Sequence, residues 1–223
     1  MEAPIIKSLM QHGTNLNGND ILDLYTDTPF GNMTLKWFDI VQRIDCLNDT
    51  IVSLYKNFAL RNDIRVNQAN FGILVDPKLS YVQTYQTEEI IYWLRKTTDE
   101  FIGLLYLSDY KKTYNKYPSK IKISSIAEYL HSSQSFDNIL DPHITFLENL
   151  NNVSNAYKHS FINHEVLNYH GENEPLAIAL RLDYNRLENG HQFYTLALRS
   201  ILNEFDLMIG KLKQKLASEF VYR

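Results

Sequence analysis

The chain has 223 residues, with 22 basic and 26 acidic side chains and a formal net charge of -4 at pH 7. Hydrophobic residues make up 44% of the sequence and charged residues 22%, which is typical of a globular domain and excludes a disordered or low-complexity chain. The net negative charge excludes a global basic field that would attract nucleic acid or an anionic membrane, so such a contact requires a local patch.

The contents of glycine, proline and cysteine indicate the fold class and the compartment. The 8 glycines and 6 prolines are too few for the turns of an all-β sandwich of this length, so we expect helices to dominate. The single cysteine, Cys46, excludes an internal disulfide and suits a reducing cytosol. No apolar run approaches the roughly 20 residues of a membrane span, and residues 3–6 are too few for a secretory signal. We expect a cytoplasmic protein that contacts no membrane.

The N-terminal part of the chain predicts an irregular arm that leads into a helical domain. Residues 1–32 show no sustained period and are expected to be irregular. Residues 33–223 are expected to form a single helical-bundle domain. Within it, apolar side chains from position 33 to about 61 recur at three- and four-residue steps, which predicts a first long helix packed on one face.

A second long helix is predicted after a connection. Residues 62–86 lose the helical period, so we expect a packed connection there, with a short strand at 71–75. Thr87 is followed by Glu88 and Glu89, a hydroxyl cap and two anions of the kind that begin a helix. We therefore expect the second long helix to start at Thr87 and to end before Pro118.

The second half of the sequence predicts two more long helices around a hairpin. A short helix is expected at 124–132, and Asp141 followed by Pro142 predicts the N-cap and first turn of a helix over 142–163. Alternating apolar residues predict a β-hairpin between 165 and 185, and a renewed helical period predicts the last helix from Leu198. The predicted fold is all-α, a bundle of four long helices with a short accessory helix and an inserted hairpin.

A local basic patch is present at the end of the second helix. The segment 110–122 contains five lysines and three tyrosines and no acidic residue. Lysines neutralise phosphates and tyrosines stack on bases, so Lys111, Lys112, Lys116 and Tyr114 are candidates for nucleic-acid binding. The alternative is structural, because cations complement the dipole at the C-terminus of a helix in proteins of every function.

A row of polar side chains is predicted on the helix over 142–163. Its members recur at steps of four, three, four and four residues and are Glu148, Asn152, Asn155, His159 and Asn163. Such steps place them on one face, opposite an apolar face that includes Tyr157 and Phe161. Histidine changes charge near neutral pH, and flanking amides can orient its ring or a polar ligand. The alternative is a solvated helix face in an asparagine-rich chain.

The segment 154–159, with the sequence SNAYKH, resembles the signature of the HEPN superfamily of all-helical prokaryotic proteins, which occur in toxin-antitoxin and antiphage systems. That signature is an arginine, a short spacer and then a histidine, often with an asparagine directly after the arginine. Asn155 and His159 match it, and a looser resemblance extends from Thr87 to Leu216. The resemblance implies dimers that bring two motifs together and, in active members, RNA cleavage without a metal ion.

The sequence departs from the signature at the arginine. Ser154 stands in its place, and no arginine occurs between Arg95 and Arg181. RNA cleavage through the 2′-hydroxyl needs a base and a cation that stabilises the phosphorane. His159 can act as the base, whereas Lys158, the nearest cation, is about 100° away around the helix. We therefore expect a degenerate site that is very slow or non-catalytic.

Two functional hypotheses remain open. The first is an HEPN-like cytoplasmic protein of a defence or toxin-antitoxin type system that binds RNA or a cognate partner protein, or cleaves RNA weakly, with His159, Asn155 and Lys158 at the site. The second is a non-enzymatic dimeric interaction protein. Both predict a homodimer with the helix over 142–163 near the two-fold axis. No cofactor is expected, and no metal, since the zinc-protease pattern that begins at His164 has Asn168 in place of its second histidine.

Overall fold

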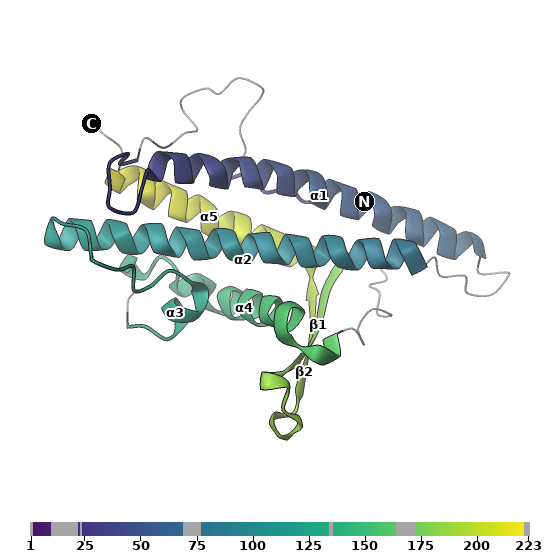
Figure 1. Cartoon of the computed structure of the whole chain (residues 1–223). Coiled ribbons are helices and arrows are strands. Elements are labelled where there is room, and N and C mark those ends of the chain that lie inside the picture. The colour runs from purple at the N-terminus through teal and green to yellow at the C-terminus, as the bar shows by residue number, and fades with distance from the viewer. Residues whose placement is uncertain are drawn as a thin grey trace. The chain divides into compact units, whose positions relative to one another are not determined.

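The computed structural model describes residues 2–9, 22, 24–68, 77–133, 136–163 and 173–220. As predicted, the described chain is mainly helical, with packed helices and a small antiparallel hairpin (Figure 1). It divides into two compact units, each assembled from three stretches of the sequence. Unit 1 comprises Met1–Ile5, Leu47–Trp93 and Asn149–Asn203, and unit 2 comprises Ile6–Cys46, Leu94–Glu148 and Glu204–Arg223. The single domain over 33–223 stays a prediction.

The first two helices are longer than the sequence pattern predicts. Helix α1 spans Met33–Gln68 and helix α2 spans Pro77–Tyr114. The connection predicted at 62–86 is therefore wrong at 62–68 and at 77–86, which are helical. Proline is favoured at a first helical position, where its missing N–H has no intrahelical partner. Thr87 does not cap a helix, because its hydroxyl donates to the Gln83 carbonyl oxygen at 2.8 Å inside α2. The strand predicted at 71–75 lies outside the described residues.

The middle of the chain contains short helices that lead into α4. Helix α3 spans Ile126–Leu130, and the Ser125 hydroxyl caps it by accepting a hydrogen bond from the Glu128 N–H. Two 3₁₀ turns follow, η1 at Phe136–Asn138 and η2 at Asp141–His143. Asp141 is the first residue of η2 and Leu140 precedes it as the cap, so the predicted N-cap is off by one residue. Helix α4 spans Ile144–His159 and ends before the predicted residue 163.

The hairpin lies later in the chain than predicted. Strand β1 spans Leu176–Leu182 and strand β2 spans His191–Ala197; they pair antiparallel in unit 1, from Leu176 opposite Ala197 to Leu182 opposite His191. The 3₁₀ turns η4 (Asp183–Asn185) and η5 (Leu187–Asn189) connect them. Strand β1 falls within the predicted 165–185 and is confirmed, whereas its partner β2 was not predicted; residues 164–172 lie outside the described ranges. Helix α5, Leu198–Phe220, begins where predicted.

The core of unit 2 is built around an aromatic pair and includes the N-terminal arm. Trp37 and Phe101 are fully buried and meet edge to face, with ring centroids 5.5 Å apart. The described arm residues contain no helix or strand, and Ile6, Leu9 and Leu24 are buried. The arm therefore contributes to this core instead of lying loose in solvent.

Candidate functional site

The C-terminal end of α4 is joined to the hairpin within unit 1. The Leu182 N–H donates to the Ser160 hydroxyl oxygen at 3.1 Å, and the Leu180 N–H donates to the Asn163 side-chain oxygen at 3.0 Å. Asn163 is buried and lies beyond the end of α4. Its amide thus binds strand β1 and does not extend the predicted polar row.

One amide side chain holds the loop after β1 against the end of α4. The Asn185 side chain donates from Nδ2 to the His159 carbonyl oxygen at 3.0 Å and accepts at Oδ1 from the Phe161 N–H at 2.9 Å. We call these two hydrogen bonds the Asn185 clamp. Tyr184 and Asn185 have φ angles of 53°, a left-handed conformation that asparagine tolerates and tyrosine rarely adopts.

The clamp joins a loop with an exposed tyrosine to the backbone at the candidate histidine. Tyr184 is 89% exposed and Phe161 is 81% exposed, and His159 is also exposed. Phe161 was expected on the packed face of a longer helix; since α4 ends at His159, the chain has turned before it reaches position 161. We call the region of His159, Phe161, Tyr184 and Asn185 the α4-end surface.

An arginine from the hairpin reaches the polar row of α4. Arg181 on β1 donates from Nη1 to the Asn152 side-chain oxygen at 2.5 Å and from Nη2 approaches Asp183 at 2.6 Å. Asn155 donates to the Asn151 side-chain oxygen at 3.4 Å. Glu148, the first member of the predicted row, belongs to unit 2. The row is therefore partly occupied by contacts within unit 1.

The position of the signature arginine faces inward. Ser154 is only 1% exposed, and a guanidinium there would have to be buried. Lys158, the next candidate cation, has its Nζ over the ring of Tyr92, 4.9 Å from the centroid. Lys158 is thus directed toward α2. Successive residues of a helix point about 100° apart, so Lys158 and His159 point in different directions.

The inner side of α4 packs on α2 and β1 through Tyr157. Burial raises the pKa of the Tyr157 hydroxyl, the nearby carboxylate of Glu88 raises it further, and a backbone hydrogen bond with Ile178 opposes the rise. Burial also raises the pKa of Glu88. These contacts fix the helix that carries His159 against its neighbours.

The lysine cluster lies in unit 2, at the end of α2. The Lys111 ammonium donates to the Asn115 carbonyl oxygen at 3.2 Å and lies over the Tyr117 ring, 5.3 Å from its centroid. Lys111 therefore caps the helix end, in line with the structural interpretation. Lys112 and Lys116 are exposed. Tyr114 is exposed as well, with its ring 4.5 Å from that of Tyr110.

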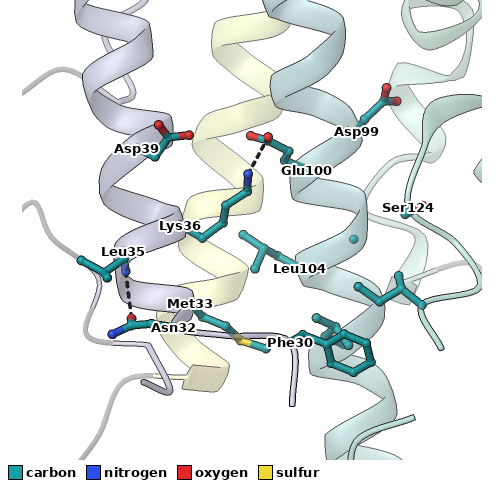
Figure 2. Close-up of a pocket in the computed structure, with 13 residues that line it drawn as sticks. Phe30, Asn32, Met33, Leu35, Lys36, Asp39, Asp99, Glu100, Leu104 and Ser124 are labelled. Atoms are coloured by element: carbon teal, nitrogen blue, oxygen red, sulfur yellow. Dashed lines mark hydrogen bonds and ion pairs between the residues drawn. The ribbon is translucent and has the colours of Figure 1, made fainter. Parts of the chain in front are cut away.

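Sequence reasoning missed a pocket of about 520 Å³ in unit 2 (Figure 2). Its lining comes from three separate stretches of the chain. They are 30–39, which leads into the first turns of α1, 99–107 on α2, and 121–124 before α3. The residues that line it are Phe30, Asn32, Met33, Leu35, Lys36, Asp39, Asp99, Glu100, Gly103, Leu104, Leu107, Ile121 and Ser124. No local motif joins them, so only the folded structure reveals the site.

A network of ion pairs borders the pocket. The Lys36 ammonium and the Arg43 guanidinium each approach Glu100 at 2.6 Å, on separate carboxylate oxygens. Arg43 also binds Asp39 and donates to the Thr97 hydroxyl oxygen at 3.3 Å. The third carboxylate, Asp99, accepts from the Ile126 N–H at 2.7 Å and thereby fixes the start of α3.

Comparison with known proteins provides no relative. No protein-family model, no curated protein and no solved structure matches the chain. Within the described ranges, no group of three or more His, Cys, Asp and Glu side chains has the arrangement of a metal site. No described helix is both long and apolar enough to cross a membrane. The resemblance to HEPN proteins rests on the residues quoted for it.

Proposed function

We propose that the protein is an HEPN-like cytoplasmic protein that binds single-stranded RNA on the α4-end surface. The observation that supports this most is the Asn185 clamp, which ties an exposed tyrosine loop to the backbone at His159 and Phe161. Exposed rings held beside a histidine suit unpaired bases, because aromatic side chains stack on bases of any sequence.

Cations near this surface can neutralise phosphates. Lys158 is exposed beside Tyr92, and Arg186, which directly follows the clamp residue, has a side chain that is 67% exposed and only 3.6 Å from Glu188. An exposed pair of this length is weak, so Arg186 can exchange its carboxylate for a phosphate. We therefore assign the backbone of the RNA to Lys158 and Arg186 and its bases to Tyr184 and Phe161.

Binding is a better-supported activity than cleavage. His159 is exposed and can accept a proton. Arg181 does not supply the cation that a cleavage site also requires, since it is held by Asn152 and Asp183, and Lys158 lies about 100° from His159 around the helix. We expect metal-independent cleavage, if measured, to be very slow.

The decisive experiment is fluorescence anisotropy with a labelled single-stranded RNA of mixed sequence. Tyr184→Ala should weaken binding by about tenfold, since a base-aromatic stack contributes about 1–3 kcal/mol. Tyr85→Ala is the matched control, because Tyr85 is also an exposed tyrosine of unit 1 but lies on α2. Absence of RNA binding, or equal effects of the two substitutions, would contradict the proposal.

A second candidate function is a non-enzymatic interaction protein that forms homodimers. Exposed apolar side chains in unit 1 favour it: Phe161, Tyr184, Leu187 and Phe193. Exposed apolar side chains mark a protein contact when they gather in one patch. Under this alternative a second copy or a cognate partner covers the α4-end surface, and RNA is not bound.

A further inference from the structure

The pocket of unit 2 has the size and the composition of a small-molecule site. Its volume of about 520 Å³ falls within the range of ligand sites, about 300–1,000 Å³. The lining has an apolar part with Phe30, Met33 and Leu104 and a charged part with Glu100 and Asp39 (Figure 2). A ligand that fills the pocket therefore needs an apolar body and a polar or charged head.

The charges that line the pocket favour a positive head. Three carboxylates and one ammonium are among the lining residues, namely Asp39, Asp99, Glu100 and Lys36. Arg43 and Arg95 pair with these carboxylates and balance the remaining negative charge, but neither lines the pocket. The charged residues that line the pocket are thus mainly carboxylates, whose oxygens accept hydrogen bonds from a cation.

The protein's own lysine already occupies the position of such a head. The Lys36 side chain extends from α1 to Glu100 (Figure 2), with its Nζ 2.6 Å from Oε1. The Lys36 side chain is 41% exposed and that of Glu100 is 14% exposed. If Lys36 leaves, the Arg43 guanidinium still pairs with Glu100 at 2.6 Å, so this carboxylate keeps a partner. Lys36 can therefore move its ammonium into water at small cost, while its aliphatic stem stays on the apolar surface.

We propose that this pocket binds a small organic amine. The ligand ammonium replaces that of Lys36 at Glu100, beside the carboxylate of Asp39, and its apolar body lies against Met33 and Leu104. The pocket belongs to unit 2 and the α4-end surface to unit 1, so this proposal does not depend on RNA binding.

The first test uses 2-phenylethylamine, which is protonated at pH 7 as lysine is, with 2-phenylethanol and 3-phenylpropanoate as neutral and anionic comparators. Titration into ¹⁵N-labelled protein should shift the backbone amide signals of Gly103 and Ser124, which line the pocket. The amine should bind most tightly of the three. Absence of any shift with the amine, or tighter binding of the alcohol or the carboxylate, would overturn the proposal.

A lysine variant distinguishes a cation site from an anion site. Lys36→Gln removes the internal competitor and should tighten binding of the amine by about fivefold, the equivalent of an ion pair of about 1 kcal/mol. It should leave the affinity for the alcohol unchanged. Lys56→Gln, the same substitution at an exposed site further along α1, should change neither. If Lys36→Gln instead weakens amine binding, or tightens amine and alcohol equally, the proposal fails.

Removal of a carboxylate should have the opposite effect on the affinity for the amine. Asp39 is 61% exposed at its side chain, so Asp39→Asn should preserve the fold, which circular dichroism checks. Loss of this carboxylate should weaken amine binding several-fold and leave binding of the alcohol unchanged. Unchanged amine affinity in a folded Asp39→Asn protein would contradict the proposed position of the head.

Discussion

The side chain of Asn185 donates a hydrogen bond to the backbone carbonyl oxygen of His159 across 26 residues of sequence. That carbonyl lies in the last turn of α4, where carbonyl groups have no intrahelical partner. The asparagine thus caps the helix from a distant loop. The same contact fixes where the helix stops and where the tyrosine loop begins, and the candidate histidine lies between the two.

Loss of the Asn185 clamp should destabilise unit 1 locally. Asn185→Ala removes both hydrogen bonds, and alanine adopts the left-handed conformation of this position less readily than asparagine does. The expected loss in the free energy of unfolding is about 1–3 kcal/mol. Asn185→Gly removes the same hydrogen bonds but accepts the positive φ, so it should cost less. Urea denaturation measures both, and hydrogen exchange should show faster exchange at Phe161. Equal stability of the wild type and both variants would show that the clamp is unimportant.

Replacement of Glu88 by glutamine should stabilise the protein at neutral pH. Burial raises the folded-state pKa of Glu88 above its ordinary value of 4.5, so the folded protein binds this proton more tightly than the unfolded chain does. Stability from this group is present below the unfolded pKa and is lost as pH rises through the folded pKa. Glu88→Gln should therefore raise stability at pH 7 and lose that advantage below about pH 4.5.

Glu89→Gln is the matched control for this pH experiment, because Glu89 is the next residue of α2 and is exposed. Thermal unfolding over a series of pH values measures the effect. A Glu88→Gln protein that is less stable than the wild type at pH 7 would mean that the carboxylate has a stabilising partner in the folded state.

Any RNA cleavage by this protein should depend on His159 and not on a metal. If the wild type cleaves RNA slowly, EDTA should leave the rate unchanged and His159→Ala should abolish it, since the ring is the proposed base. Arg181→Lys should not alter the rate, because Arg181 contacts Asn152 and Asp183 and has no proposed role in cleavage. Cleavage that survives His159→Ala would remove the histidine from the proposed site.

The lysines at the C-terminal end of α2 provide a salt-dependent test. If RNA contacts this segment, the triple variant of Lys111, Lys112 and Lys116 to glutamine should bind more weakly, and the slope of log affinity against log salt should lessen by about 0.7 for each lost phosphate contact. Lys111→Gln alone should mainly destabilise the end of α2, because Lys111 caps it. An unchanged slope would leave all three lysines with structural roles.

Self-association through the α4-end surface is the prediction that separates the two candidate functions. A homodimer built at the α4-end surface should scatter light as about twice 26.1 kDa, and Tyr184→Glu should convert it to monomer by placing a charge in an apolar contact. Leu35→Glu, at an exposed apolar residue of unit 2, should leave the dimer intact. A monodisperse monomer at high concentration would contradict the homodimer.

Sequence patterns predicted the helices wherever an apolar face is packed, as in α5, whose start at Leu198 was found. They failed at the start of α2 because the buried positions there are polar: Ser80, Gln83 and Thr87 lie at helical spacing and are all buried. Strand β2 was missed for the opposite reason. Most of its residues are exposed or half-buried on both faces, so no alternation of apolar and polar side chains marks it.

The candidate sites differ in how far the sequence could reveal them. His159 and Asn155 form a local pattern on one helix and were found. The Asn185 clamp joins residues 24 and 26 positions apart, and the pocket of unit 2 is assembled from three stretches of chain. Nothing in the local order of residues signals such contacts, since they arise only when the chain has packed.

The attachment of the N-terminal arm to α5 has a consequence for how the protein is made. Asp206 accepts hydrogen bonds from the backbone N–H groups of Lys7 and Ser8, over 199 and 198 residues of sequence. A Cβ on Gly210 would come within 2.9 Å of the Ser8 hydroxyl, so the arm lies almost against the α5 backbone there. During synthesis the arm leaves the ribosome before α5 does, so Ile6 and Leu9 lack their α5 contacts until α5 has been made. The arm can therefore dock on α5 only after the residues that separate Ser8 from Asp206 have been synthesised.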